Sequence, residues 1–490
     1  MNIYNRTTII YALFFVVVLF TLFYETMPTN LMIHSKFDGA IYAEQSKNFG
    51  ELFQNDGISK YYVQRLLPAF FVWCFFTILN VHITDNLIIT SFQFLNLLGI
   101  GFIAFFWNKI LNLITTSLNH KILGISILLF SFPILKYPLY YPVLNDLSAV
   151  LIGTLLLYFH LVDKKTPFIL TVFFGSFVFP TTIVIGGLLF CFREKNNLKT
   201  KIPLFFKNSH LIAMIVGISL FLFLEYYLII RIYNFDWIPY NLRSFSNTNT
   251  FLYILSLVGV CIFILIICYN FYIESFIYKA FQSIDLKQIG LFLGVVIIIK
   301  VGQFLIANNE ASEMTIFKHL KLLISTIPSH PFKWLVAHFS YFGVLFIFIF
   351  IFFKQLKNNF FQQNIGISLV VLFFITYSFS TESRQFVSFF PFIAFWFLSS
   401  VRNVTFGNKF VFATVLSSIV LSRFWYPLNL AFPDNENLIG GMTQFPLQHL
   451  FMLFGPWIST KTYFLQLFVF ILFLFVFITL SKKDTSIVKN

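Results

Sequence analysis

The chain has 490 residues, of which 58% are hydrophobic and only 11% are charged, and its mean hydropathy is +0.83. Soluble domains carry about 25% charged residues, so this chain has too few to cover a surface that faces water. The composition therefore excludes a soluble globular protein. It predicts an all-α, polytopic membrane protein whose residues 1–490 form a single transmembrane domain.

Apolar segments of bilayer length recur along the chain. A spanning helix needs roughly 20 apolar residues, and this criterion predicts about 12 to 14 transmembrane helices. The segments lie near residues 8–24, 66–81, 87–107, 122–138, 144–162, 167–192, 211–232, 251–274, 289–306, 336–353, 364–380, 386–401, 409–425 and 462–480. No small-residue cleavage site follows the first segment, so we expect it to remain as a membrane anchor.

The segment 167–192 allows two interpretations because Pro180 lies near its middle. In the first, the segment crosses the membrane once as a single helix. In the second, two half-helices turn at Pro180 and both basic flanks stay on the cytoplasmic side. The second interpretation requires that another segment upstream also fails to cross. The residue pattern alone does not choose between them.

Lysine and arginine gather in alternate loops from residue 193 onward. Loops 193–210, 275–288, 354–363 and 402–409 and the tail 481–490 contain 14 Lys and Arg, whereas loops 232–250, 307–335, 381–385 and 426–460 contain 5. Basic loops stay in the cytoplasm. The second set, together with loop 25–65, is therefore predicted to be extracytoplasmic, and the C-terminus cytoplasmic. The net charge of +14 largely reflects this bias and does not indicate a nucleic-acid partner.

The first outer loop, 25–65, is predicted to contain an amphipathic helix that begins at Asp38 and lies on the membrane surface. The predicted apolar face consists of Ile41, Gln45, Phe49, Leu52 and Phe53. Asp38 stands where an N-cap would stand, so its carboxylate is either a helix cap or a functional group. Arg65, at the start of the second segment, either snorkels toward lipid headgroups or binds a phosphate.

Other polar residues lie in the later outer loops or inside predicted spans. Glu382 and Arg384 stand two residues apart, where they form either a surface ion pair or part of a site. Loop 426–460 is rich in aromatic residues and is predicted to form a lid over an outer cavity. Lys300 and Glu225 are expected to face the bundle interior or water. Cysteine and histidine spacings match no metal motif, so no metal site is predicted.

Several short motifs resemble the GT-C superfamily of membrane glycosyltransferases. The resemblance rests on two features of the first loop. One is an acidic residue soon after the first span, Asp38 in KFDGAIYAEQ, and the other is the sequence YYVQRLLPAF that leads into the second segment. Asn145 and Asp146 resemble the polar start of a later span in that family. FGSFVFPTTIVIGG resembles its paired short helices, which favours the hairpin interpretation of 167–192. The resemblance covers mainly residues 1–192.

The resemblance implies a GT-C-like fold and transfer of a sugar from a polyprenyl-phosphate-linked donor to an extracytoplasmic glycan or lipid acceptor. The setting it implies is a bacterial inner membrane. Asp38 would be the general base, and Arg65, Arg384 or Lys300 would stabilise the leaving phosphate. Substrate contacts are expected from Tyr42, Glu44, Arg65, Asn145, Asp146, His330, Glu382 and Arg384.

Three points stay open at the level of the sequence. The first loop lacks an adjacent pair of acidic residues, so no cofactor is predicted and the use of a divalent cation is undecided. A lipid-linked glycan polymerase or ligase would have a related outer site with different catalytic residues. A transporter or flippase without enzymatic activity would instead place its polar residues along a path at the membrane midplane.

Overall fold

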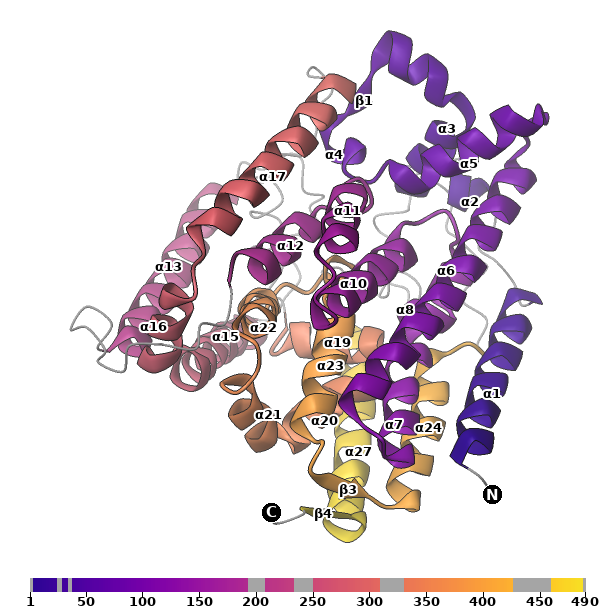
Figure 1. The fold of residues 1–490 in the computed structure, drawn as a ribbon. Helices are drawn as coiled ribbons and strands as arrows, with labels where there is room; N and C mark the ends of the chain where they lie inside the picture. The colour runs from indigo at the N-terminus through magenta and orange to yellow at the C-terminus, as the bar shows by residue number, and fades with distance from the viewer. Residues whose placement is uncertain are drawn as a thin grey trace.

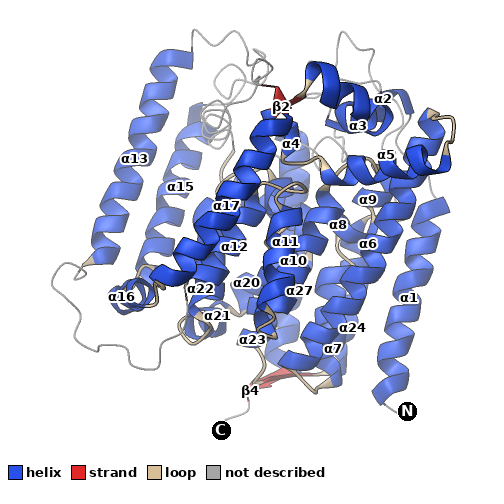
Figure 2. Ribbon diagram, turned by 45° about the horizontal axis from the view of Figure 1, so that its top comes forward, coloured by secondary structure: helices blue, strands red, loops and turns tan. Residues whose placement is uncertain are grey.

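The computed structural model describes residues 3–23, 29–33, 38–192, 208–232, 250–308, 330–425 and 460–487. Within these ranges the protein is a bundle of α-helices with a two-stranded sheet near each end (Figure 1, Figure 2). The helices of the first half are α1 (Ile3–Phe23), α2 (Thr29–Ile33), α3 (Asp38–Glu51), α4 (Lys60–Val63), α5 (Leu67–Leu79), α6 (Asp85–Ile114), α7 (Leu118–Leu129), α8 (Phe132–Leu135), α9 (Tyr137–Tyr140), α10 (Asp146–Leu161), α11 (Lys165–Gly175) and α12 (Thr181–Cys191).

The second half contains α13 (Ser209–Ile232), α15 (Thr250–Phe271), α16 (Glu274–Gln282), α17 (Leu286–Ile306), α19 (Lys333–Phe342), α20 (Val344–Ile351), α21 (Phe353–Phe360), α22 (Ile365–Tyr377), α23 (Phe390–Ser400), α24 (Asn408–Ser422) and α27 (Thr460–Asp484). A π-helical turn covers Leu52–Asp56 and a 3-10 turn covers Ser383–Phe386. The strands are β1 (Ile58–Ser59), β2 (Ala307–Asn308), β3 (Val404–Phe406) and β4 (Thr485–Ile487).

Five helices in the described ranges are long and apolar enough to cross a bilayer: α6, α13, α15, α17 and α27. The bent pair formed by α7 with α8 and α9 is a sixth if it counts as one span. The chain is therefore an integral membrane protein. The sequence predicted 12 to 14 spans. Most of the other predicted segments hold helices that are shorter or broken.

The predicted segment 122–138 is broken rather than straight. The axis bends by 65° between α7 and α8–α9, and Pro133 stands in the first turn of α8. Proline cannot donate the backbone hydrogen bond that would continue a helix. The buried side chain of Asn96, on α6, donates to the carbonyls of Pro138 at 2.8 Å and Pro142 at 2.9 Å. A polar side chain from a neighbouring span thus anchors α9 and the turn after it to α6.

Segment 167–192 forms a hairpin of two short helices, α11 and α12, which confirms the half-helix geometry of the second interpretation. A Cβ atom added at Gly186 would lie 2.6 Å from a methyl group of Val172. The rings of Phe168 and Phe190 stack with centroids 6.1 Å apart. Residues so far apart in the sequence touch only if the two helices run antiparallel. Both flanks of the hairpin therefore lie at the same end of the bundle.

The upstream segment that fails to cross is α5, and the prediction of a span at 66–81 was wrong. Contacts with α3 join the middle of α5 and the segment beyond its far end to the same loop layer. Phe49 packs on Trp73 with ring centroids 5.1 Å apart, in the middle of α5. Beyond α5, the Asp85 carboxylate accepts a hydrogen bond from Lys47 at 2.6 Å. A helix whose middle and far end both contact α3 runs along this layer instead of through the membrane.

Helix α3 begins at Asp38, as the sequence predicted, but its buried face differs from the predicted one. Its buried residues are Gly39, Tyr42, Ala43, Gln45 and Ser46. Of the predicted face only Gln45 is among them, and the side chain of Phe53, beyond the end of α3, is 54% exposed. The reason is that α3 packs on α5 and on Tyr141 rather than lying only on lipid. Gly39 is required at this contact because a Cβ there would overlap Tyr141 Oη and the Met32 carbonyl.

The loops group at two opposite ends of the bundle. Figure 2 shows α2, α3, α4 and β2 at one end, and both termini with β4 at the other. Strand β1, in the first loop, pairs in parallel with β2 at the end of α17. At the opposite end β3 pairs with β4, and Asp285 N donates to the Cys191 carbonyl at 3.0 Å. The predicted grouping is confirmed for these loops, whereas residues 193–207, 233–249, 309–329 and the predicted lid at 426–459 lie outside the described residues.

Candidate active site

Three stretches that are far apart in the sequence meet at the end of the bundle that carries α3. The first loop contributes Asp38, the first residue of α3, and Arg65, in the turn between α4 and α5. The start of α10 contributes Asp146, and the 3-10 turn contributes Arg384. These four side chains, here named the Asp–Arg cluster, form a continuous series of charged contacts.

Asp38 lies between the two arginines of the cluster. Its Oδ2 atom is 3.7 Å from Arg65 Nη1 and 3.7 Å from Arg384 Nη2. Tyr62 Oη donates a hydrogen bond to Oδ1 at 3.1 Å. The separations from the arginines exceed those of normal hydrogen bonds, so neither guanidinium group holds the carboxylate tightly. With 25% of its side chain exposed, against 3% for Asp146, Asp38 is the acidic group that a substrate can reach.

Asp146 binds the guanidinium group of Arg384 through two hydrogen bonds. Arg384 donates from Nε to Asp146 Oδ1 at 3.0 Å and from Nη2 to Oδ2 at 3.1 Å, which is the paired geometry that an arginine fork favours. Tyr341 Oη adds a longer hydrogen bond to Oδ1 at 3.4 Å. Asp146 was expected to contact substrate. The structure places it where it orients Arg384, whose guanidinium group then faces Asp38.

Aromatic rings contact the guanidinium group of Arg65, and Asn145 binds its backbone carbonyl. Its guanidinium carbon lies 4.2 Å from the centre of the Tyr61 ring and 5.4 Å from that of Phe179, both within cation–π range. The amide of Asn145 donates a short hydrogen bond to the Arg65 carbonyl. Arg65 Nε is buried, and no hydrogen-bond acceptor lies within reach among the described residues. A buried donor of this kind is suited to an incoming anionic oxygen.

Both arginines of the cluster keep their positive charge. Burial by itself would lower the pKa of Arg65, but the adjacent tyrosines and Asp38 outweigh it and raise the pKa above its usual value. Burial opposes the charge of Arg384 as well, and Asp146 is the main group that raises its pKa. Burial raises the pKa of Tyr61 to about 12, so its hydroxyl stays protonated at neutral pH.

Two predicted contact residues of the first loop differ in their positions. Tyr42 is buried and packs edge-on against Tyr62, with ring centroids 5.8 Å apart, so it supports the cluster from below. Glu44 is exposed and accepts a hydrogen bond from Asn48 Nδ2 at 2.7 Å, on the face of α3 that turns away from the cluster. Glu44 is therefore a surface residue.

Glu382 and Arg384 do not form the predicted surface ion pair. Arg384 binds Asp146 instead, a residue 238 positions away in the sequence. Glu382 accepts a hydrogen bond from Gln385 Nε2 at 2.5 Å. Its charge acts on Tyr61, which places Glu382 at the edge of the Asp–Arg cluster.

His330 lies apart from the cluster, between α15 and α27. Its carbonyl accepts a hydrogen bond from Ser256 Oγ at 3.0 Å, and its ring lies 4.8 Å from the Tyr463 ring. Burial and then the nearby charge of Lys333 lower the pKa of His330 to about 3, so the imidazole is neutral near pH 7. The contacts of the described chain do not join it to Asp38.

The two intramembrane charges, Lys300 and Glu225, also lie outside the cluster. Lys300 Nζ donates to Gln303 at 2.9 Å, and Gln303 in turn donates to the Ser176 carbonyl at the turn of the hairpin. Lys300 is exposed on α17, so of the two expected settings, the bundle interior and water, the structure excludes the interior. Glu225 is buried, as expected, and accepts a hydrogen bond from Tyr253 at 3.5 Å.

Sequence analysis did not find three residues that shape the cluster: Tyr62, Phe179 and Tyr341. Tyr62 stands in the motif YYVQRLLPAF, in which only Arg65 was expected to have a role. Phe179 precedes Pro180 at the turn of the hairpin, and only the hairpin brings it under Arg65. No local signal marks Tyr341, whose hydroxyl meets Asp146 through helix packing.

Among the described residues, no three His, Cys, Asp or Glu side chains gather in a way that would hold a metal ion. The two carboxylates of the Asp–Arg cluster face guanidinium groups instead. In comparisons with known proteins, the chain matches no protein-family model, no curated protein and no solved structure. The chemical argument therefore rests on the residues of the cluster.

Proposed function

We propose that the protein is a membrane glycosyltransferase that moves a sugar from a polyprenyl-phosphate-linked donor to a glycan or lipid acceptor. The observation that carries this proposal is the position of the Asp38 carboxylate, partly exposed and between two arginines. The distribution of Lys and Arg supports an extracytoplasmic site and a cytoplasmic C-terminus. The resemblance of the first 192 residues to the GT-C superfamily points to the same activity and fold.

The proposed reaction assigns different tasks to the carboxylate and the arginines. Asp38 accepts the proton of the acceptor hydroxyl while that oxygen forms a bond to the anomeric carbon of the sugar. The bond from the anomeric carbon to the phosphate oxygen breaks, and the polyprenyl phosphate leaves with the electron pair. Arg65 and Arg384 stabilise the negative charge that grows on the leaving phosphate.

The test is transfer activity of the purified protein with a radiolabelled polyprenyl-phosphate sugar. Asp38→Asn keeps the shape of the side chain and its ability to cap a helix, but removes the base. Loss of a general base costs typically 10²- to 10⁴-fold in rate, and we expect a loss of that size. Glu44→Gln is the matched control, because Glu44 lies on the same helix outside the cluster. Near wild-type turnover by Asp38→Asn would show that Asp38 is structural.

The pair of arginines favours one alternative function, a lipid-linked glycan polymerase or ligase that relies on Arg65 and Arg384 alone. Such an enzyme would lose activity in Arg65→Gln and keep it in Asp38→Asn. A transporter or flippase has less support, since the polar cluster lies at one end of the bundle instead of midway along it.

A further inference from the structure

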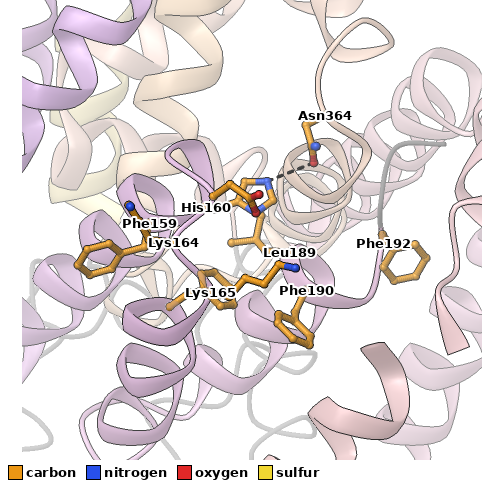
Figure 3. A pocket seen from close by; sticks show the side chains of 10 residues that line it. Phe159, His160, Lys164, Lys165, Leu189, Phe190, Phe192 and Asn364 are labelled. Carbon is orange, nitrogen blue, oxygen red and sulfur yellow. Dashed lines mark hydrogen bonds between the residues drawn. The ribbon is translucent and has the colours of Figure 1, made fainter. Parts of the chain in front are cut away.

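A cavity of about 420 Å³ lies between α10, α11, α12 and α22 (Figure 3). It contacts His160 near the end of α10, whereas Asp146, in the Asp–Arg cluster, begins the same helix. Fourteen residues of helix separate the two, a length of about 21 Å. The cavity therefore opens at the end of the bundle opposite to the candidate active site.

The polar lining of the cavity is mainly cationic. Lys164 and Lys165 stand exposed at the junction of α10 and α11. Figure 3 shows the Lys165 side chain extending beside Phe190. Asp163 is the one carboxylate among the lining residues, so the two lysines leave a local charge of +1 when His160 is neutral. This balance favours an anionic ligand.

His160 is oriented by a hydrogen bond at the rim of the cavity. Its Nε2 atom lies 3.3 Å from Asn364 Oδ1, which also accepts the backbone N–H of Gly366 at 3.0 Å. Because Asn364 Oδ1 is an acceptor in both contacts, His160 donates from Nε2. The side chains that line the polar half of the cavity are thus held by α10 and α22 together.

Aromatic side chains form the other half of the lining. The rings of Phe168 and Phe190 stack nearly parallel, at an interplanar angle of 14°, and join α11 to α12. Phe159 and Phe192 extend this apolar surface. A cavity that has lysines next to stacked rings matches an amphiphile with a negative headgroup and an apolar chain.

The sequence that follows Phe192, a lining residue of the cavity, is also basic. Residues 193–207, which directly follow Phe192, contain five Lys or Arg and one Glu. Basic segments and basic pockets between helices on the cytoplasmic side attract the headgroups of anionic lipids. We propose that this cavity binds the phosphate headgroup of an anionic phospholipid, with Phe168 and Phe190 beside the first carbons of its acyl chain. This site is independent of the proposed transferase activity.

The helices that line the cavity all lead to the Asp–Arg cluster. Helix α10 begins with Asp146, the turn between α11 and α12 contains Phe179 beneath Arg65, and the segment after α22 contains Arg384. A lipid bound across their far ends would hold them together. We therefore expect the bound lipid to raise the melting temperature of the protein.

The experiment measures lipid binding by native mass spectrometry of the full chain in neutral detergent. Phosphatidylglycerol is compared with phosphatidylcholine of the same acyl chains, and glycerol 3-phosphate is added as a soluble competitor. We expect a tighter first binding event for phosphatidylglycerol. Lys164→Gln/Lys165→Gln should weaken it about 10- to 30-fold, since each lysine contributes about 1 kcal/mol and 1.4 kcal/mol is tenfold.

The matched control is Lys482→Gln/Lys483→Gln, a pair of adjacent exposed lysines at the same end of the bundle but outside the cavity. This pair should leave the binding unchanged. Equal binding of the two lipids would overturn the proposal, as would an equal loss in both lysine pairs, which would indicate a diffuse surface charge. Competition by glycerol 3-phosphate at the concentration of the lipid would show a site for soluble phosphate and not for lipid.

Discussion

Arg384 connects the two acidic groups of the candidate site. It forms a paired hydrogen bond to buried Asp146 and reaches toward Asp38. Because Asp146 belongs to α10 and Arg384 to the segment between α22 and α23, the pair also joins two parts of the bundle. Arg384 therefore contributes both to the stability of the fold and to the proposed chemistry. Mutation can separate its effect on stability from its effect on activity.

Removal of Arg384 alone should be costly for stability. Arg384→Met leaves the Asp146 carboxylate buried without its cation, and breaking a buried pair in this way costs about 3–5 kcal/mol. The double variant Arg384→Met/Asp146→Asn removes the isolated charge and should recover much of that free energy of unfolding. Unfolding in a denaturing detergent measures both. A single variant as stable as the wild type would contradict a structural role for the pair.

At the scale of the element, the attachment of α9 and the turn after it to α6 depends on Asn96. Asn96→Leu would leave the carbonyls of Pro138 and Pro142 without their donor inside the bundle. Each unsatisfied buried group costs about 1–3 kcal/mol, so we expect a clear drop in the melting temperature. Asn86→Leu is the control, because Asn86 is an exposed residue of the same helix. Equal melting temperatures for the two variants would argue against this role.

Helix α10 approaches the segment that carries Arg384 unusually closely. A Cβ atom added at Gly153 would overlap the backbone carbonyl of Ser388, four residues after Arg384. Backbone atoms cannot move aside easily, so Gly153→Ala should destabilise the protein by about 1–3 kcal/mol. Gly101→Ala on α6 adds the same methyl group where no atom lies within 4 Å, and it should be tolerated. Thermal unfolding in detergent distinguishes the two variants.

At the scale of the whole molecule, the two ends of the bundle should lie on opposite sides of the membrane. Glu44→Cys, on the exposed face of α3 at the end of the bundle that carries the Asp–Arg cluster, should react with an impermeant maleimide added to intact cells. Lys482→Cys, at the end of α27, should react only after the membrane is permeabilised. The four native cysteines are buried or half-buried, so their background labelling should be low. Labelling of both variants in intact cells would contradict the proposed orientation.

The sequence alone determined the class of the protein, the positions of its helices and the grouping of its loops. Hydropathy is a property of each segment by itself, and basic residues label loops one at a time, so both can be read along the chain. The start of α3 at Asp38 was predictable for the same reason, because helix initiation depends on neighbouring residues.

Tertiary structure decided which apolar segments cross and which polar residues meet. The apolar run of α5 suits either lipid or the surface of another helix, and only its contacts with α3 show that it stays in the outer layer. Likewise, Asp146 and Arg384 are 238 residues apart, and no local pattern announces their pairing. Contacts of this kind depend on the summed packing of distant helices, which a one-dimensional hydropathy pattern does not contain.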